Sequence, residues 1–270
     1  MRSGISRAIE ILTIFLSSES STYFVEPSNC ICLSFEFFVV KQNDIVYIHR
    51  GLMSDYKIHN LVYLHGFASS PNSNKANHIT KFFKNKGINI HIPDLNCGNF
   101  TDTTISKMLD RISSDIEEIN ESFIIVGSSM GGYLAALFAE RHKRSPMRLI
   151  LLAPGFDLCR LFTKWLGEYG IDKWKRDGYF DFLHYSYNSE IPLSYEFYRD
   201  LCRHSPYPDI KGIAAHIIHG SRDDVVPVEV SKIFQSKNPQ TTIEITNDTH
   251  ELSSSIDLIT NRIDAILKDF

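Results

Sequence analysis

The stretch that decides the fold lies near the middle of the chain and reads FIIVGSSMGG, from Phe123 to Gly132. Its apolar beginning predicts a buried strand, and apolar residues at helical spacing over Met130–His142 predict a helix directly after it. Between the two, a G-x-S-x-G motif places Ser129 at the tip of a tight turn, where the flanking residues must have almost no side chain. The turn therefore predicts a nucleophilic serine. The alternative is a turn rich in glycine and serine that merely connects strand and helix.

The same alternation of short apolar runs with amphipathic segments extends from residue 58 to the C-terminus. The predicted strands are Leu61–Leu64, Ile88–Ile92, Phe123–Val126, Arg148–Leu152, Ala214–Ile218 and Thr242–Ile245. The predicted helices are Asn74–Lys86, Asp102–Asn120, Met130–His142, Val228–Ser236 and Ile256–Leu267. Strands that are apolar throughout and alternate with helices indicate an α/β fold, with a mostly parallel sheet covered by helices on both faces.

An insertion at about residues 157–209 interrupts this alternation. Residues 161–198 contain 12 aromatic side chains in 38 positions, including both tryptophans, against 12% aromatic residues in the whole chain. We expect this segment to lie over the sheet as a lid rather than to form another strand–helix unit. Its aromatic residues either line or gate a substrate pocket or form the lid's own core, and the sequence does not separate the two.

An acid and a histidine follow the last two predicted strands. In proteins of this architecture the order along the chain is serine, acid, histidine. We expect Asp223, in the segment from His219 to Pro227, to be the acid that orients the histidine, with Asp224 as the other candidate. The alternative for both is a turn that caps the next helix. His250 lies on the following loop and is the candidate base, because parallel strands end at the same edge of a sheet. A solvated loop histidine is the alternative for His250.

Two backbone amides are candidates to stabilise an oxyanion. One belongs to Met130, which follows the predicted nucleophile, and the other to Phe67, in the loop after the first predicted strand. His65 lies in the same loop but precedes the serine, so we expect it to make a structural hydrogen bond and not to be the base.

Composition excludes several classes of protein. With 270 residues and 43% hydrophobic residues, the chain has the composition of an ordinary globular domain. A formal net charge of −4 argues against a nucleic-acid-binding protein, and no apolar run has the roughly 20 residues of a membrane-spanning helix. The segment Gly127–Gly132 does not match the dinucleotide-binding pattern. The cysteines are odd in number and mostly far apart, which predicts reduced thiols: Cys30, Cys32, Cys97, Cys159 and Cys202.

Residues 1–52 form an N-terminal extension that precedes the predicted domain of residues 53–270. Two of its segments, Ile31–Val40 and Ile45–His49, predict a β-hairpin. Residues 1–22 have some features of a secretory signal or transit peptide, but Glu10 interrupts the apolar part. A start of the protein at Met53 is a third interpretation.

Taken together, these motifs resemble the α/β-hydrolase superfamily over about residues 58–270. The block from Tyr63 to Pro71, with Ser73, Lys75 and Ala76, is more specifically similar to small YqiA-type bacterial esterases and to acyl-protein thioesterases. The resemblance implies hydrolysis of carboxylic esters or thioesters without a metal or organic cofactor. By position it implies Ser129 as nucleophile, Asp223 as acid, His250 as base, and Phe67 and Met130 as oxyanion donors. Residues 1–52 have no counterpart in that pattern.

The expected partner is a small-molecule or acyl-bearing substrate, with no nucleic acid and no stable membrane insertion, and the expected location is the cytoplasm. Two other functions use the same residues. One is a non-catalytic small-molecule-binding protein with this fold, and the other is an acyltransferase with an acceptor other than water. The sequence determines neither the acyl chain length nor the oligomeric state.

Overall fold

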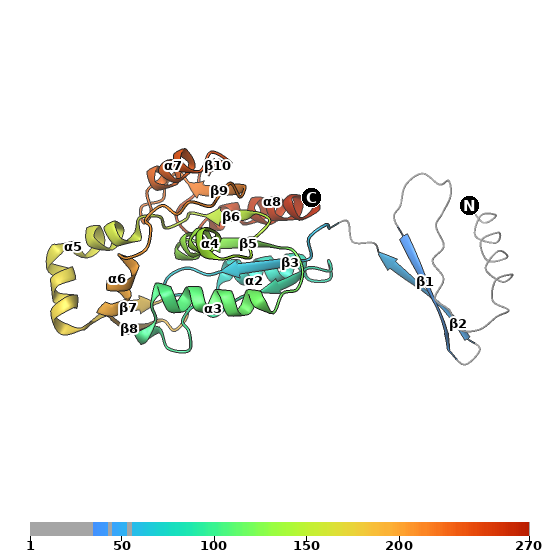
Figure 1. Ribbon diagram of the computed structural model, residues 1–270, viewed down its shortest axis with the longest axis horizontal. Coiled ribbons are helices and arrows are strands. Elements are labelled where there is room, and N and C mark those ends of the chain that lie inside the picture. Colours follow the sequence, from blue (N-terminus) through green and yellow to red (C-terminus); the bar gives the residue numbers. More distant parts are fainter. Residues whose placement is uncertain (1–34, 43–44, 53–55, 270) are drawn as a thin grey trace. The chain divides into compact units, whose positions relative to one another are not determined.

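The computed structural model describes residues 35–42, 45–52 and 56–269, the first two ranges by their backbone alone (Figure 1). The predictions of a leader at residues 1–22 and of a start at Met53 lie outside the described residues. The chain divides into two compact units, Met1–Asp55 and Tyr56–Phe270, and each is described by itself.

The first unit contains a β-hairpin. Strands β1 (Phe35–Gln42) and β2 (Ile45–Leu52) pair antiparallel, with Phe35 opposite Leu52 and Gln42 opposite Ile45. The predicted hairpin is therefore confirmed, and its second strand extends three residues beyond the predicted end, from His49 to Leu52.

The second unit is built on a six-stranded parallel sheet, which confirms the predicted α/β fold. Its strands are β3 (Asn60–Leu64), β4 (Asn89–His91), β5 (Phe123–Ser128), β6 (Leu149–Leu152), β9 (Ala215–Gly220) and β10 (Thr241–Thr246). Their spatial order is β10-β9-β6-β5-β3-β4. The chain thus reverses its direction of travel across the sheet after β4. Such a reversal leaves a crevice at the carboxyl ends of the strands on either side of it, here β3 and β5.

Helices cover both faces of this sheet. They are α2 (Asn74–Phe83), α3 (Ile105–Glu117), α4 (Met130–Arg141), α7 (Val228–Lys237) and α8 (Ile256–Lys268). Buried side chains of α3, α4 and α7 pack in one hydrophobic cluster, and those of α2 and α8 pack in a second. Successive residues of one strand alternate between the two: Leu61 lies in the second cluster and Val62 in the first.

Helices α2 and α3 are clearly shorter than predicted, while α4 ends one residue early, at Arg141. Helix α3 begins only at Ile105 because the Thr104 side chain accepts a hydrogen bond from the Lys107 amide, an N-cap that separates it from a short 3₁₀ turn over Phe100–Asp102. Helix α2 ends at Phe83, where Lys84 leaves the helical conformation. None of the helices in the described part of the chain combines the length and apolar character needed to cross a membrane.

The aromatic insertion forms a separate layer beside the carboxyl ends of the sheet strands (Figure 1). It consists of α5 (Leu158–Asp177), which bends at Gly167, the hairpin of β7 (Tyr179–His184) and β8 (Ser189–Ser194), and α6 (Tyr195–Leu201). The Tyr185 amide donates to the Ala68 carbonyl oxygen (2.9 Å) in the loop after β3. As predicted, the lid is not a further strand–helix unit of the main sheet, because β7 and β8 pair only with each other.

Three of the aromatic residues of the lid are fully buried. Phe162, Trp174 and Phe197 are at most 1% exposed, and the Trp174 ring nitrogen donates to the Leu193 carbonyl oxygen (2.8 Å). The Phe162 ring lies 5.7 Å from that of Phe197 and 6.1 Å from that of Trp174. These three side chains are buried in the same hydrophobic cluster as one face of the sheet, so they form a core, but one that the lid shares with the main domain.

The expectation of reduced cysteines is wrong for one pair. Cys159 in α5 and Cys202 at the end of α6 form a disulfide that joins residues 43 positions apart in the sequence. Sequence spacing gave no sign of it, because the two residues meet only after both lid helices have packed together. Cys97 is a free cysteine.

Replacing Trp174 with alanine should remove the centre of the lid core and lower the free energy of unfolding by about 3–5 kcal/mol. Trp165→Ala is the matched control, since Trp165 lies in the same helix but is 42% exposed, and should cost less than about 1 kcal/mol. Chemical denaturation measures both, and hydrogen exchange shows whether the loss is confined to the lid. Equal losses for the two variants would contradict this description of the core.

Candidate active site

Ser129 lies in the sharp turn between β5 and α4. Its φ of 54° and ψ of −118° are in a region that side chains other than glycine rarely adopt, as a strained nucleophile turn requires. Neighbouring segments fix this backbone. The Ser129 amide donates to the Leu152 carbonyl oxygen at the end of β6 (2.8 Å), and its carbonyl oxygen accepts from the Gly155 amide (2.9 Å). The strain is thus held in place by the adjacent strand and the loop that follows it.

Gly131 allows the loop after β3 to approach this turn. A Cβ atom at Gly131 would lie 2.1 Å from the Leu64 carbonyl oxygen, so no other residue fits without a shift of the backbone. Gly66, which lies two residues after Leu64 in the same loop, then packs beside the serine. A Cβ atom built on Gly66 would be 3.5 Å from the Cβ of Ser129. The last glycine of the G-x-S-x-G motif therefore serves the contact between two strand ends.

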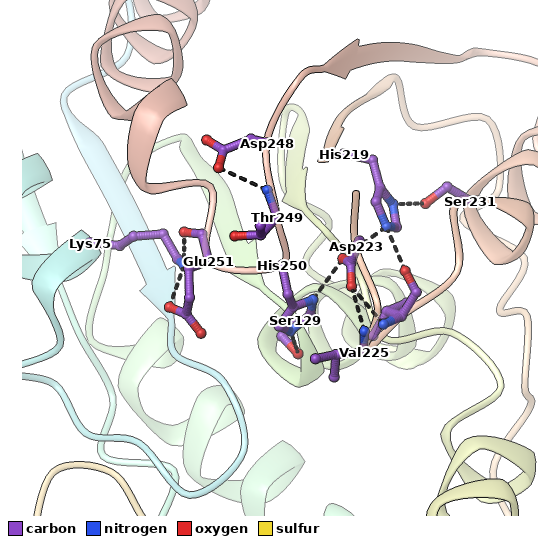
Figure 2. A network of polar contacts seen from close by, with 11 residues as sticks. Lys75, Ser129, His219, Asp223, Val225, Ser231, Asp248, Thr249, His250 and Glu251 are labelled. Carbon is purple, nitrogen blue, oxygen red and sulfur yellow. Dashed lines mark hydrogen bonds and ion pairs between the residues drawn. The ribbon is translucent and has the colours of Figure 1, made fainter. Parts of the chain in front are cut away.

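His250 connects Ser129 with Asp223 (Figure 2). Its Nε2 atom lies 2.9 Å from Ser129 Oγ, and its Nδ1 atom lies 2.7 Å from Asp223 Oδ2. The three residues come from the loops that follow β5, β9 and β10. Because all three strands are parallel, these loops emerge at one edge of the sheet. The structure thus brings together the serine, acid and histidine that the sequence singled out.

The Asp223 carboxylate is completely buried and has hydrogen-bond donors on both oxygens. Oδ1 accepts from the amides of Val225 (3.0 Å) and Val226 (2.7 Å). Burial raises the pKa of this carboxyl, but the hydrogen bonds from His219, His250 and the Val226 amide outweigh it and hold the pKa well below its usual range.

Asp223 therefore stays ionised and contacts His250. Its hydrogen bonds from the Val225 and Val226 amides shape the turn before α7, but the predicted cap is absent, because α7 has no side-chain hydrogen bond at its N-cap. The neighbouring Asp224 is exposed.

Gly220, like Gly131, allows another backbone segment to approach closely, here the loop that carries His250. A Cβ atom at Gly220 would lie 2.4 Å from the Asp248 carbonyl oxygen and 2.5 Å from that of Thr249. Only a glycine at the end of β9 lets the segment just before His250 pack against that strand. The distance between His250 and Asp223 thus depends on the absence of a side chain at this position.

Polar contacts hold the histidine loop on both sides of His250 (Figure 2). Before it, the Asp248 carboxylate accepts from the Thr249 amide (2.8 Å). The same carboxylate also accepts from Ser255 Oγ (2.9 Å). After it, Lys75 Nζ of α2 donates to the Glu251 carbonyl oxygen (2.7 Å). Burial lowers the pKa of Lys75, and the Glu251 carboxylate 3.6 Å away opposes that effect.

The two candidate oxyanion donors belong to the two segments that meet at Ser129, the start of α4 and the loop after β3. Met130 is the first residue of α4. Its amide is therefore one of the N–H groups at the start of the helix that have no carbonyl acceptor within the helix. Phe67 follows Gly66. Its ring packs against four others, with centroids 5.3 to 5.6 Å away: Phe100, Phe162, Phe182 and Phe197. The backbone position of Phe67 is thereby tied to the packing of the lid.

His65 has the structural role expected from its sequence position. It is 1% exposed, and its Nε2 atom accepts a hydrogen bond from the Leu95 amide (3.1 Å) in the loop after β4. Its Nδ1 atom is 3.0 Å from the Gly66 carbonyl oxygen and donates to it. His65 therefore joins the loops after β3 and β4. Within the described residues, no group of three or more His, Cys, Asp or Glu residues is arranged to hold a metal ion.

Several residues of this network have roles that the sequence did not predict. His219 and Lys75 lie within the motifs, and the four-residue spacing of His219 and Asp223 is the one signal that points to a contact between them. Ser231, Asp248 and Ser255 gave no signal, because their partners are determined by how α7 and the loop after β10 pack.

The fold and this arrangement of residues define an α/β hydrolase. The chain belongs to the family described as "Uncharacterised protein family (UPF0227)", whose sequence profile matches residues 60–268. This match supports the resemblance to YqiA-type esterases inferred from the motifs. Among curated proteins, none matches the sequence significantly.

Solved structures of α/β hydrolases share the fold. Alpha/beta hydrolase domain-containing protein 10 from mouse is 19% identical and has a TM-score of 0.66, and the match covers 92% of this chain and 98% of that one. A putative hydrolase from Agrobacterium vitis S4 is 21% identical, with a TM-score of 0.68 and the same coverage. Est1E from Butyrivibrio proteoclasticus, in a structure with bound ferulic acid, is 17% identical, with a TM-score of 0.67 and coverage of 91% and 97%.

The variant Gly220→Ala should push the Asp248–Thr249 backbone away from β9 and separate His250 from Asp223. We expect hydrolysis of a chromogenic ester, the activity that the sequence resemblance implies, to lose roughly 100-fold in kcat/KM. Thermal unfolding of the same sample shows that the protein is folded. An unchanged kcat/KM in a folded variant would mean that the histidine loop does not depend on this contact.

Proposed function

We propose that this protein is a serine hydrolase that cleaves carboxylic esters or thioesters through an acyl-enzyme on Ser129. The observation that supports the proposal most is the chain of two hydrogen bonds, 2.9 Å and 2.7 Å long, from Ser129 through His250 to Asp223. A serine hydroxyl is a weak nucleophile unless a positioned base takes its proton. His250 is within reach of that proton, and an ionised Asp223 stabilises the imidazolium that results.

In this proposal the reaction has two stages. His250 accepts the proton of Ser129 while the oxygen attacks the acyl carbonyl, and it then returns the proton to the departing alcohol or thiol. A water molecule, deprotonated by the same histidine, next attacks the acyl-enzyme and releases the acid. The negative charge that develops on the carbonyl oxygen is stabilised by the amides of Phe67 and Met130. The place of Met130 at the start of α4, and of Phe67 directly after Gly66, which packs beside Ser129, supports this assignment.

Esters are the first substrates to test. The chain has the fold of Est1E, which binds ferulic acid, and also of a monoacylglycerol lipase from Paleococcus ferrophilus (16% identity, TM-score 0.59). Thioesters undergo the same attack at the carbonyl carbon and differ in the leaving group. The proposed partner is therefore a small-molecule or acyl-bearing substrate. The expectation of a cytoplasmic location rests on reduced cysteines, and the Cys159–Cys202 disulfide removes that support.

A fluorophosphonate probe tests for an activated serine. The wild type should gain the mass of one adduct, and Ser129→Ala should gain none and lose on the order of 10⁴-fold to 10⁶-fold in kcat. Ser122→Ala is the matched control and should label fully. Ser122 is exposed and directly precedes β5, whereas Ser129 directly follows that strand. If the folded wild type takes up no probe, or if Ser129→Ala retains more than a tenth of the activity, the proposal fails.

In a plot of log(kcat/KM) against pH, the rising part on the acidic side (the acidic limb) should have a slope of one. Hydrogen bonds keep the pKa of Asp223 well below its usual range, so this carboxylate stays charged over the working range and contributes no second proton. Protonation of a single group, the base, should then account for the whole fall in activity on the acidic side. A limb with a slope of two, or one centred where carboxylates titrate, would show that Asp223 is protonated together with the base.

A further inference from the structure

A second histidine contacts the candidate triad acid from the side away from Ser129 (Figure 2). His219 lies in β9 and is 0% exposed, and its Nε2 atom is 3.1 Å from Asp223 Oδ2. The same nitrogen is 2.9 Å from the Val226 carbonyl oxygen, and Nδ1 is 2.8 Å from Ser231 Oγ of α7. Ser231 is also 0% exposed. The proposed reaction uses neither residue, although both are buried and both are polar.

The partners of His219 determine where its proton lies. A carbonyl oxygen can only accept a hydrogen bond, so Nε2 carries a hydrogen and points it toward Val226 and Asp223. Nδ1 is then the acceptor and receives the hydroxyl hydrogen of Ser231. This tautomer satisfies each buried group without placing a second charge beside the carboxylate.

We propose that His219, oriented by Ser231, is a positioning residue for the triad acid. This inference rests on the proposed function. Asp223 Oδ2 lies between two histidine nitrogens: it accepts a hydrogen bond from His250 Nδ1 (2.7 Å), and His219 Nε2 is 3.1 Å away. The amides of Val225 and Val226 hold the other oxygen, Oδ1. His219 therefore holds Asp223 Oδ2 in place. Its Nε2 hydrogen also lowers the share of the negative charge of Oδ2 that acts on His250.

The direction of the effect follows from this sharing. Without the donor from His219, more negative charge on Oδ2 faces His250 and stabilises its protonated form. The acidic limb of kcat/KM should then move to higher pH.

The other charged groups around the site come from other elements: Lys75 from α2, and Asp248 and Glu251 from the loop after β10. Substitutions at His219 leave all three in place, so the shift of the limb reports on His219.

The test compares substitutions in β9 and α7 of the full-length protein, with p-nitrophenyl acetate as substrate. His219→Phe keeps an aromatic ring of similar size and removes the donor. We expect kcat to fall roughly tenfold to a hundredfold, as for loss of a hydrogen bond to a charged group, with KM unchanged and the limb about half a pH unit higher. His219→Gln keeps a donor, so its kcat and the pH of its acidic limb should both lie close to the wild-type values. His216→Phe, in the same strand with its ring near Thr242 and Glu244, is the control and should behave as wild type.

Ser231→Ala keeps the test decisive if His219→Phe does not fold. It removes the hydrogen bond to Nδ1 that strengthens the donor at Nε2, so the limb should shift in the same direction by less. A merely structural role would lower the amount of active protein without moving the limb.

If the limb stays at the wild-type pH in folded His219→Phe, or in Ser231→Ala where His219→Phe does not fold, the inference is overturned. The proposed function is judged separately, by labelling of wild-type Ser129 with the fluorophosphonate.

Discussion

The hydrogen bond between His250 Nδ1 and Asp223 Oδ2 is the interaction on which the rest of the site depends. At 2.7 Å it joins the loops after two adjacent parallel strands, and it turns the imidazole so that Nε2 faces Ser129. The bond exists because Gly220 lets the backbone of the histidine loop pack against the end of β9. A side chain at that one position would separate the two residues. The arrangement of charge in the site therefore follows from a close contact between two backbones.

The site combines strain with rigid support. Ser129 is held at a positive φ, which costs free energy, and hydrogen bonds to β6 and the loop after it keep the turn in place. On the acid side, His219 and two backbone amides surround a buried carboxylate. On the base side, Asp248 and Lys75 fix the loop around His250. A constellation supported in this way needs little reorganisation as charge develops, which is the condition under which electrostatic stabilisation is most effective. The lid contributes through Phe67, whose ring is packed among its aromatic side chains.

Much of this was predictable from the sequence, for a physical reason. Apolar strands, amphipathic helices and the turn around Ser129 are local patterns, and the parallel sheet brings the ends of β5, β9 and β10 to one edge. Asp223 and His250 could therefore be singled out by position alone. Contacts between elements distant in sequence gave no comparable signal. Ser231 meets His219 only when α7 packs on β9, and Cys159 meets Cys202 only when two lid helices pack together. The role of the lid's aromatic residues was likewise determined by which of them became buried.

An acyl-enzyme trapped at Ser129 would test the central claim most directly. The full-length protein is mixed with p-nitrophenyl acetate, quenched in acid within the first turnover and digested for peptide mass mapping. The account predicts a burst of about one nitrophenolate per chain and one acetyl group on the peptide that contains Ser129. Turnover of the ester with no acyl group on that peptide, or with the acyl group on another residue, would contradict it.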